Sequence, residues 1–181
     1  ASHNPNFVQY KRRLLDEATY GADYLVRAHV PGGSFYQSIG APGKAKAAKD
    51  RLINPTNYRQ VIKTTPGSAG SAEQGKAEWP RDYEASFRTG GGMAIAALAA
   101  ASTLPWHRDF TNRRYLETAE NAFRYLQQHN RELLSDGEED IVADYCALLA
   151  ATELYRASHD ETWRKIADGG ADRLVVRLAS H

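Results

Sequence analysis

Carboxylates and aromatic rings gather in two polar segments, each of which leads into an apolar, alanine-rich stretch. The segments comprise Trp79, Arg81, Asp82, Tyr83, Glu84 and Arg88, and Asp136, Glu138, Glu139, Asp140, Asp144 and Tyr145. Aromatic rings can pack on the apolar faces of a sugar while charged groups bind its hydroxyls. Two carboxyl groups could also cleave a glycosidic bond, at about 5–5.5 Å apart for retention or about 6.5–9.5 Å for inversion. These residue types favour a carbohydrate site, although the sequence gives no distance between them.

Several of the same residues also have a purely structural interpretation. Residues 138–140 could form a solvated acidic first turn that complements the dipole of the following helix. The glycines at 90–92 could serve only for close packing, although the electropositive start of a buried helix is also a common binding site. Asp144 lies one turn into an apolar helix, so we expect it to be buried with a partner such as Arg88, or to line a cavity.

Periodicity and capping residues predict five helices. They cover 6–29, the segment from 92 to about 104, 111–131, 141 to about 157, and a last helix after residue 160, with Thr111, Asp140 and Asp160 as N-caps. The second and fourth are apolar nearly all round, as buried helices are, and the other three have one apolar face. In the first helix the apolar stripe includes Phe7, Leu14 and Ala22, and Asp23 falls on the solvent-facing side. Beyond these helices, only a small hairpin of 35–39 and 58–63 is suggested.

This alternation predicts an all-α double layer in which inner and outer helices follow one another. The connections after the first and third helices are long or acidic, and the other two are short. In an antiparallel series the long connections therefore lie at one end, together with the N-termini of both inner helices. We place the functional face at that end, with residues 31–80 as a long loop on it.

The composition argues against several classes of function. The 181 residues carry a net charge of +1 with both signs interleaved, so neither a nucleic-acid surface nor a membrane surface is expected. Cys146 is the one cysteine and falls in an apolar helix, which favours a buried, inert thiol. The six histidines have no metal-ligand spacing, so neither a metal nor another cofactor is expected. No signal-peptide pattern opens the chain, and its location, cytoplasmic or periplasmic, stays open.

Three segments of the chain carry longer patterns. Leu14–Leu25 reads L-L-D-E-A-T-Y-G-A-D-Y-L, Ser86–Ser102 contains F-R-T-G-G-G before its alanine-rich run, and Asp144–Ser158 reads D-Y-C-A-L-L-A-A-T-E-L-Y-R-A-S. In order and register they resemble three helices of glycoside hydrolase family 9. The glycine run and the D-Y-C-A-L version are most similar to the bacterial branch that contains exo-β-glucosaminidases acting on chitosan oligosaccharides. The resemblance implies an (α/α)6 barrel and hydrolysis of a β-1,4-glycosidic bond with inversion.

The catalytic groups of that family have no counterpart in this sequence. The family's base belongs to a D-A-G-D motif upstream of the L-L-D-E helix, which does not occur here, and its general acid is a glutamate near the end of the domain. The resemblance therefore implies that residues 1–181 are the central part of the barrel, with no catalytic residue assigned. At the matching positions it implies substrate-binding roles, which fall on Asp82, Tyr83, Arg88, Asp144 and Tyr145. The expected partners are an oligosaccharide and the remaining barrel segments, or another chain, which would cover the exposed inner helices.

Two alternatives fit the same helical pattern. An enzyme of another (α/α)6 family, such as a sugar epimerase or a polysaccharide lyase, would call for clustered histidines or a catalytic Tyr/Arg pair, and the histidines do not cluster. A non-catalytic helical module for carbohydrate binding or scaffolding would call for a fixed repeat period and short loops. The helix lengths here vary, and residues 34–80 form one long insertion.

Overall fold

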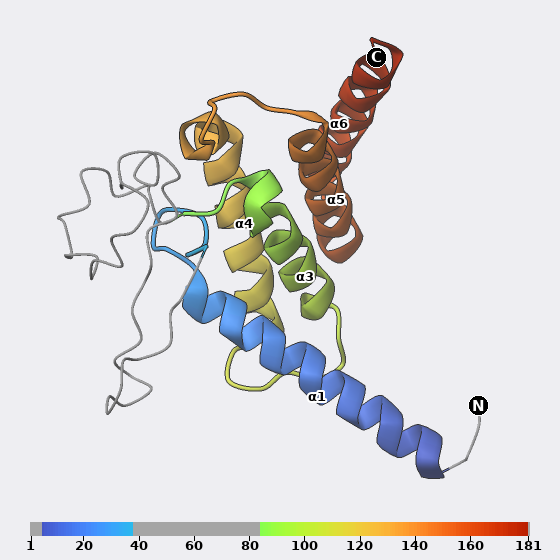
Figure 1. Cartoon of the computed structure of the whole chain (residues 1–181). Coiled ribbons are helices and arrows are strands. Elements are labelled where there is room, and N and C mark those ends of the chain that lie inside the picture. Colours follow the sequence, from blue (N-terminus) through green and yellow to red (C-terminus); the bar gives the residue numbers. More distant parts are fainter. Residues whose placement is uncertain (1–4, 38–83, 181) are drawn as a thin grey trace, which may run out of the picture.

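The computed structural model of the protein describes residues 5–37 and 84–180 (Figure 1). These residues form five α-helices: α1 (Pro5–Ala28), α3 (Gly92–Ser102), α4 (Asn112–His129), α5 (Ile141–Ser158) and α6 (Glu161–Ala179). A π-helical turn, η3 (Phe87–Gly91), precedes α3, and a 3-10 turn, η4 (Asn130–Leu133), follows α4. Within the described ranges there is no β-strand, only two isolated bridges, His29 with Phe35 and Tyr36 with Glu84. The all-α prediction is confirmed, while most of the suggested hairpin lies outside the described residues.

Local side-chain caps start three of the helices. Thr111, Asp140 and Asp160 each accept a hydrogen bond from a backbone N–H of the following turn, at 3.2, 2.9 and 2.8 Å. Such caps satisfy donors that have no partner inside the helix. His159 ends α5 in the left-handed conformation, with a φ of 57°. The predicted helix starts are confirmed, because the capping signals act over only a few residues.

The helices form two layers. Figure 1 shows α3 between α4 and α5, with α6 on the far side of α5 and α1 crossing near one end of α3 and α4. The inner helix α3 contributes fully buried Ile95 and Leu98 to the core. On the outer side, Phe87, Phe123 and Trp163 form a chain of edge-to-face ring contacts, with centroids 5.2 and 5.1 Å apart. The predicted alternation of inner and outer helices is therefore present.

Glycines set the close approach of α3 to its neighbours. A Cβ on Gly92 would lie 2.7 Å from the carbonyl oxygen of Cys146 on α5, and a Cβ on Gly91 would lie 2.9 Å from the Leu126 side chain on α4. Gly90 has a φ of 122°, a conformation in which side chains are strained. The packing interpretation is thus confirmed for Gly91 and Gly92, whereas Gly90 has no atom within 4 Å of an added Cβ and serves the backbone conformation instead.

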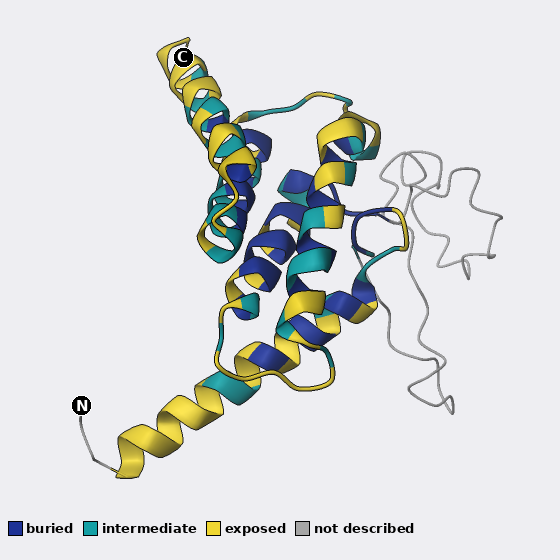
Figure 2. Cartoon of the chain, turned by 180° about the vertical axis from the view of Figure 1, so that it is seen from behind, coloured by how far each residue is buried: buried dark blue, intermediate teal, exposed yellow. Residues whose placement is uncertain are grey.

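One face of the inner pair and one end of α1 are open to solvent. Met93 on α3 and Tyr145 on α5 are each 54% exposed, although both belong to helices predicted to be apolar nearly all round. Figure 2 shows the buried residues concentrated where α3, α4 and α5 meet, and the N-terminal half of α1 exposed. Phe7 and Leu14 of the predicted stripe are exposed for this reason. Among the described residues, no helix is both long and apolar enough to cross a bilayer.

Asp23 departs from the predicted pattern of α1. The sequence places it on the solvent-facing side, but its exposed fraction is 2%. Its carboxylate accepts hydrogen bonds from the Tyr115 hydroxyl at 2.6 Å and from the backbone N–H groups of Asp109 and Phe110 at 3.1 and 3.2 Å. The prediction was wrong because the α3–α4 connection and α4 cover this side of α1, and their three donors compensate the buried charge.

Candidate functional site

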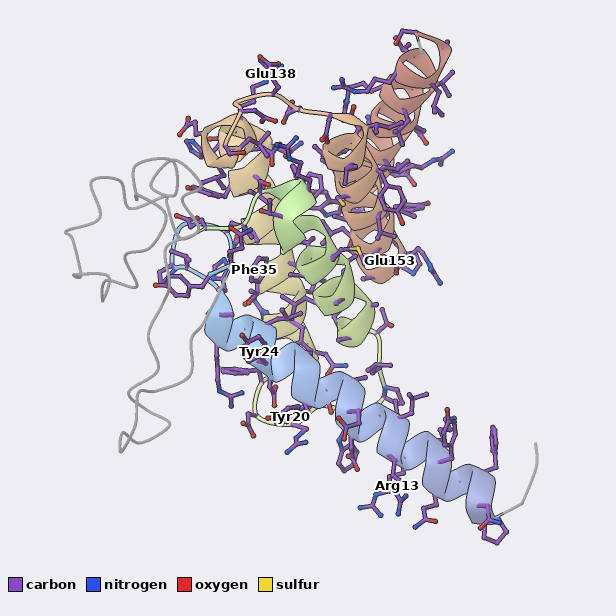
Figure 3. All side chains as sticks on the ribbon, viewed as in Figure 1. Arg13, Tyr20, Tyr24, Phe35, Glu138 and Glu153 are labelled. Carbon is purple, nitrogen blue, oxygen red and sulfur yellow. The ribbon has the colours of Figure 1, made fainter. Side chains whose placement is uncertain are left out.

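The two polar segments meet at the end of the layers where α3 and α5 begin. Arg88 lies in η3, directly before α3, and residues 135–140 lead into α5. The C-terminal end of α6 lies at the same end (Figure 1). Glu138, in the connection before α5, also lies there (Figure 3). Asp82 and Tyr83, predicted to bind substrate, lie outside the described residues.

Arg88 joins the start of α3 to the connection before α5. Its guanidinium donates to both oxygens of Asp136 at 2.9 and 2.8 Å, to Asp140 at 2.7 Å and to the carbonyl of Glu138 at 3.2 Å. The hydrogen bond from Arg88 lowers the pKa of Asp136, and the Asp140 pKa is lowered first by the N–H of Ala143 and then by Arg88. The Arg88 side chain is only 17% exposed. It therefore acts by holding this connection in place, because both terminal nitrogens of its guanidinium already donate to it.

Asn130 provides a second link between the same two segments. Its side-chain oxygen accepts from the backbone N–H of Phe87 at 2.8 Å, and its side-chain nitrogen donates to Glu139 at 2.6 Å. Asn130 is buried, so these bonds are shielded from water. The side chains of Glu139 and Asp140 are therefore tied to the body of the protein, whereas Glu138 is exposed and is held through its backbone carbonyl. Asp140 alone acts as the helix cap.

The described residues on either side of 38–83 are joined to one another. The backbone N–H of Ser34 donates to the Glu84 carboxylate at 2.7 Å, and its hydroxyl donates to the carbonyl of Ala85 at 2.7 Å. The N–H of Ala85 donates to the carbonyl of Phe35 at 2.8 Å. His29 packs edge-on against Phe35, and burial lowers the pKa of its imidazole. Both flanking segments thus leave the helical body at one point, next to η3.

Asp144 is buried as predicted, but with different partners. Its exposed fraction is 7%, and its carboxylate pairs with Arg177 and, at 3.6 Å, with Arg173, both on α6. The prediction that Arg88 is its partner was wrong, because Arg88 forms ion pairs with Asp136 and Asp140 instead. Asp144 also lines a cavity of about 380 Å³ between α5 and α6, so both parts of the prediction apply.

Two features of this end of the molecule were missed at the sequence level. Arg173 and Arg177 are four residues apart and so share one face of α6, which is a signal for a common acidic partner. The sequence does not reveal which acid that is, because the pairing depends on how α6 packs on α5. Asn130 carries no pattern of its own, since a single amide in a polar run is unremarkable. A substrate-binding role was predicted for Tyr145, and the structure places it at this end of the molecule. Its ring is exposed and so can contact a ligand.

No metal site is apparent in residues 5–37 and 84–180, where no three His, Cys, Asp or Glu side chains are grouped suitably to hold an ion. Cys146 is buried, as predicted, and burial raises the pKa of its thiol. A raised pKa keeps the thiol protonated and poorly nucleophilic.

The fold and the site together define the class of this protein. Alternating inner and outer helices, with polar connections gathered where the inner helices start, are the architecture of part of an (α/α) barrel. The sequence matches the model of a family described as Glycosyl hydrolase family 9 over residues 2–174. The chain belongs to this family.

One curated relative shows how much of a complete family member is present. The chain is 26% identical over 185 residues to Endoglucanase A of Fibrobacter succinogenes. The aligned region covers 98% of this chain but only 37% of that protein. The chain therefore spans little more than a third of the length of this relative.

Proposed function

We propose that this protein is part of an inverting β-1,4-glycoside hydrolase acting on cellulose-type or chitosan-derived oligosaccharides. The observation that carries the proposal is the family match over residues 2–174. Similarity to a protein named as an endoglucanase favours the cellulose-type substrate. The chitosan substrate is supported by the glycine run before α3 and by the D-Y-C-A-L pattern that starts at Asp144.

The proposed substrate side is the end where α3 and α5 begin. Tyr145 would offer its exposed ring to an apolar sugar face. Arg88 and Asp144 would act on substrate binding indirectly, since both side chains are largely buried and paired. Arg88 would hold the connection before α5, and Asp144 would hold the end of α6. Asp82 and Tyr83 keep their proposed contacts with substrate on the strength of the resemblance alone.

The catalytic acid and base are proposed to lie outside these 181 residues. Inverting hydrolysis needs two carboxyl groups about 6.5–9.5 Å apart, with one activating water and the other protonating the leaving group. The D-A-G-D motif that would supply the base is absent from the sequence. We therefore expect no hydrolysis by the 181-residue chain alone. We also expect the open face of the inner helices around Met93 on α3 to be covered by other barrel segments or by another chain.

The proposal is tested by incubating cellotetraose and chitotetraose with the protein as its gene encodes it, and with the 181-residue chain. Proton NMR of the first products reports their anomeric form, and inversion of a β-bond yields the α-anomer. Cleavage of one substrate class assigns the branch, and a β-anomer would refute inversion. Turnover by the 181-residue chain would contradict the placement of the catalytic groups. Absence of cleavage by the gene-encoded protein, with binding retained, would favour the non-catalytic module.

A further inference from the structure

An open cavity between α5 and α6 has a volume within the range of small-ligand sites. Its volume is about 380 Å³, and small-molecule sites usually measure roughly 300–1,000 Å³. Its lining residues are Asp144, Asp172, Arg173, Val176 and Arg177. It lies where α5 begins and α6 ends, which is the end of the layers that carries the polar connections.

The two arginines in this cavity have different tasks. Arg177 makes the closest contact with Asp144, and this hydrogen bond raises the Arg177 pKa, so the two form a fixed ion pair. Arg173 is 3.6 Å from the same carboxylate, beyond the usual length of an N–H···O hydrogen bond of about 2.7–3.2 Å. Its side chain is 58% exposed. Arg173 can therefore donate to a ligand while Arg177 continues to neutralise Asp144.

The charges and surfaces of the cavity fit a neutral polyhydroxylated ring. Two aspartates balance two arginines, so the lining carries no net charge that would select an ion. Val176 and the methylene stems of the arginines provide apolar wall against a ring face. The Asp172 carboxylate and the Arg173 guanidinium provide an acceptor and donors for hydroxyl groups.

We propose that this cavity binds one sugar ring of a β-1,4-linked oligosaccharide, with Arg173 and Asp172 as the hydroxyl-binding residues. The inference rests on the proposed function, and it adds a binding position on an outer helix of the layers. Arg177 and Asp144 keep the two helices in register around the ring. Because a hydrogen bond to a charged group is typically worth about 1.5–3 kcal/mol, loss of the Arg173 guanidinium should weaken binding about tenfold or more.

The test is an NMR titration of the gene-encoded protein, labelled at valine methyl groups, with cellotriose and separately with chitotriose. Binding in the cavity shifts the Val176 methyl signals. The same titration of Arg173→Ala should require about tenfold more sugar. Arg164→Ala is the matched control, because Arg164 lies on the same helix, pairs with Glu161 and is outside the cavity. Asp172→Asn provides a second variant that retains the size of the side chain.

Each outcome bears directly on the proposal. A shift with cellotriose that weakens in Arg173→Ala but not in Arg164→Ala supports a neutral ring. A shift with chitotriose alone, lost in Asp172→Asn, would contradict the neutral ring, because the Asp172 charge would then be selecting an amino sugar. Val176 signals that stay unchanged with both sugars at millimolar concentration overturn the proposal. If the protein still hydrolyses its oligosaccharide in that case, the proposed function stands and only this binding position is removed.

Discussion

Replacing Tyr115 with Phe removes one oxygen atom from the buried contact between α1 and α4. The Tyr115 hydroxyl donates to Asp23 at 2.6 Å, and Tyr115 itself is fully buried. In the variant, Asp23 would keep its two backbone donors, the N–H groups of Asp109 and Phe110. Burial tends to raise the Asp23 pKa, but the three hydrogen bonds and the charge of Arg27 lower it overall. The variant therefore leaves a charged carboxylate with one donor fewer.

The expected loss in the free energy of unfolding is about 1.5–3 kcal/mol, the usual contribution of a hydrogen bond to a charged group. Burial, followed by the hydrogen bond to Asp23, raises the Tyr115 pKa from 10.0 to about 12, so the hydroxyl is protonated and able to donate at neutral pH.

The assay is urea denaturation followed by far-ultraviolet circular dichroism. Tyr155→Phe is the matched control, because the Tyr155 hydroxyl lies 3.4 Å from Glu161 in an exposed contact, and its loss should cost less than about 0.5 kcal/mol. If Tyr115→Phe costs no more than this control, the assigned hydrogen bond does not stabilise the fold. A double-mutant cycle with Asp23→Asn separates the pairwise coupling from other losses.

The same contact predicts how stability depends on pH. The Tyr115 pKa is higher in the folded protein, so its contribution is complete below about pH 10 and is lost as the pH rises to about 12. The Asp23 pKa is lower in the folded protein than its usual 3.8, so its contribution is present above about pH 4 and is lost as the pH falls through the folded value. The difference between the native protein and Tyr115→Phe should therefore be largest between these limits. A difference independent of pH would contradict the ionised Asp23.

Further predictions concern Gly92, which has close neighbours, Gly169, which has none, and the ion pair between Arg88 and Asp136. Gly92→Ala should destabilise the protein by about 1–3 kcal/mol in urea denaturation, because its Cβ would lie 2.7 Å from the Cys146 carbonyl oxygen. Gly169→Ala, with no atom nearer than 3.9 Å, should instead stabilise it by about 0.5–1 kcal/mol, and equal effects would refute the close helix approach. Arg88→Gln should raise the Asp136 pKa toward 3.8 in a carboxyl NMR titration, and an unchanged pKa would show that the pair does not form in solution.

Much of the fold was predictable because helices are encoded locally. The caps at Thr111, Asp140 and Asp160 and the apolar periodicity both act within one or two turns, so the helix starts were found within a residue or two. The family resemblance was predictable for a similar reason, since its patterns lie within single helices. The π-helical turn before α3 was not predicted, because it depends on the reciprocal hydrogen bonds of Ser86 and Thr89 and on the unusual backbone of Gly90.

The sequence by itself determined which segments become helices, which of them are inner, and at which end their polar connections gather. Only the tertiary structure decided which charged groups meet. Asp144 and its partner Arg177 are 33 positions apart, and Asp23 and Tyr115 are 92 positions apart. Such pairs form when the helices that carry them pack at a particular rotation about their axes, whether the helices are consecutive, as α5 and α6 are, or distant in the chain, as α1 and α4 are. A local pattern of apolar residues specifies a helix face, but it does not specify which side chain of the neighbouring helix that face meets.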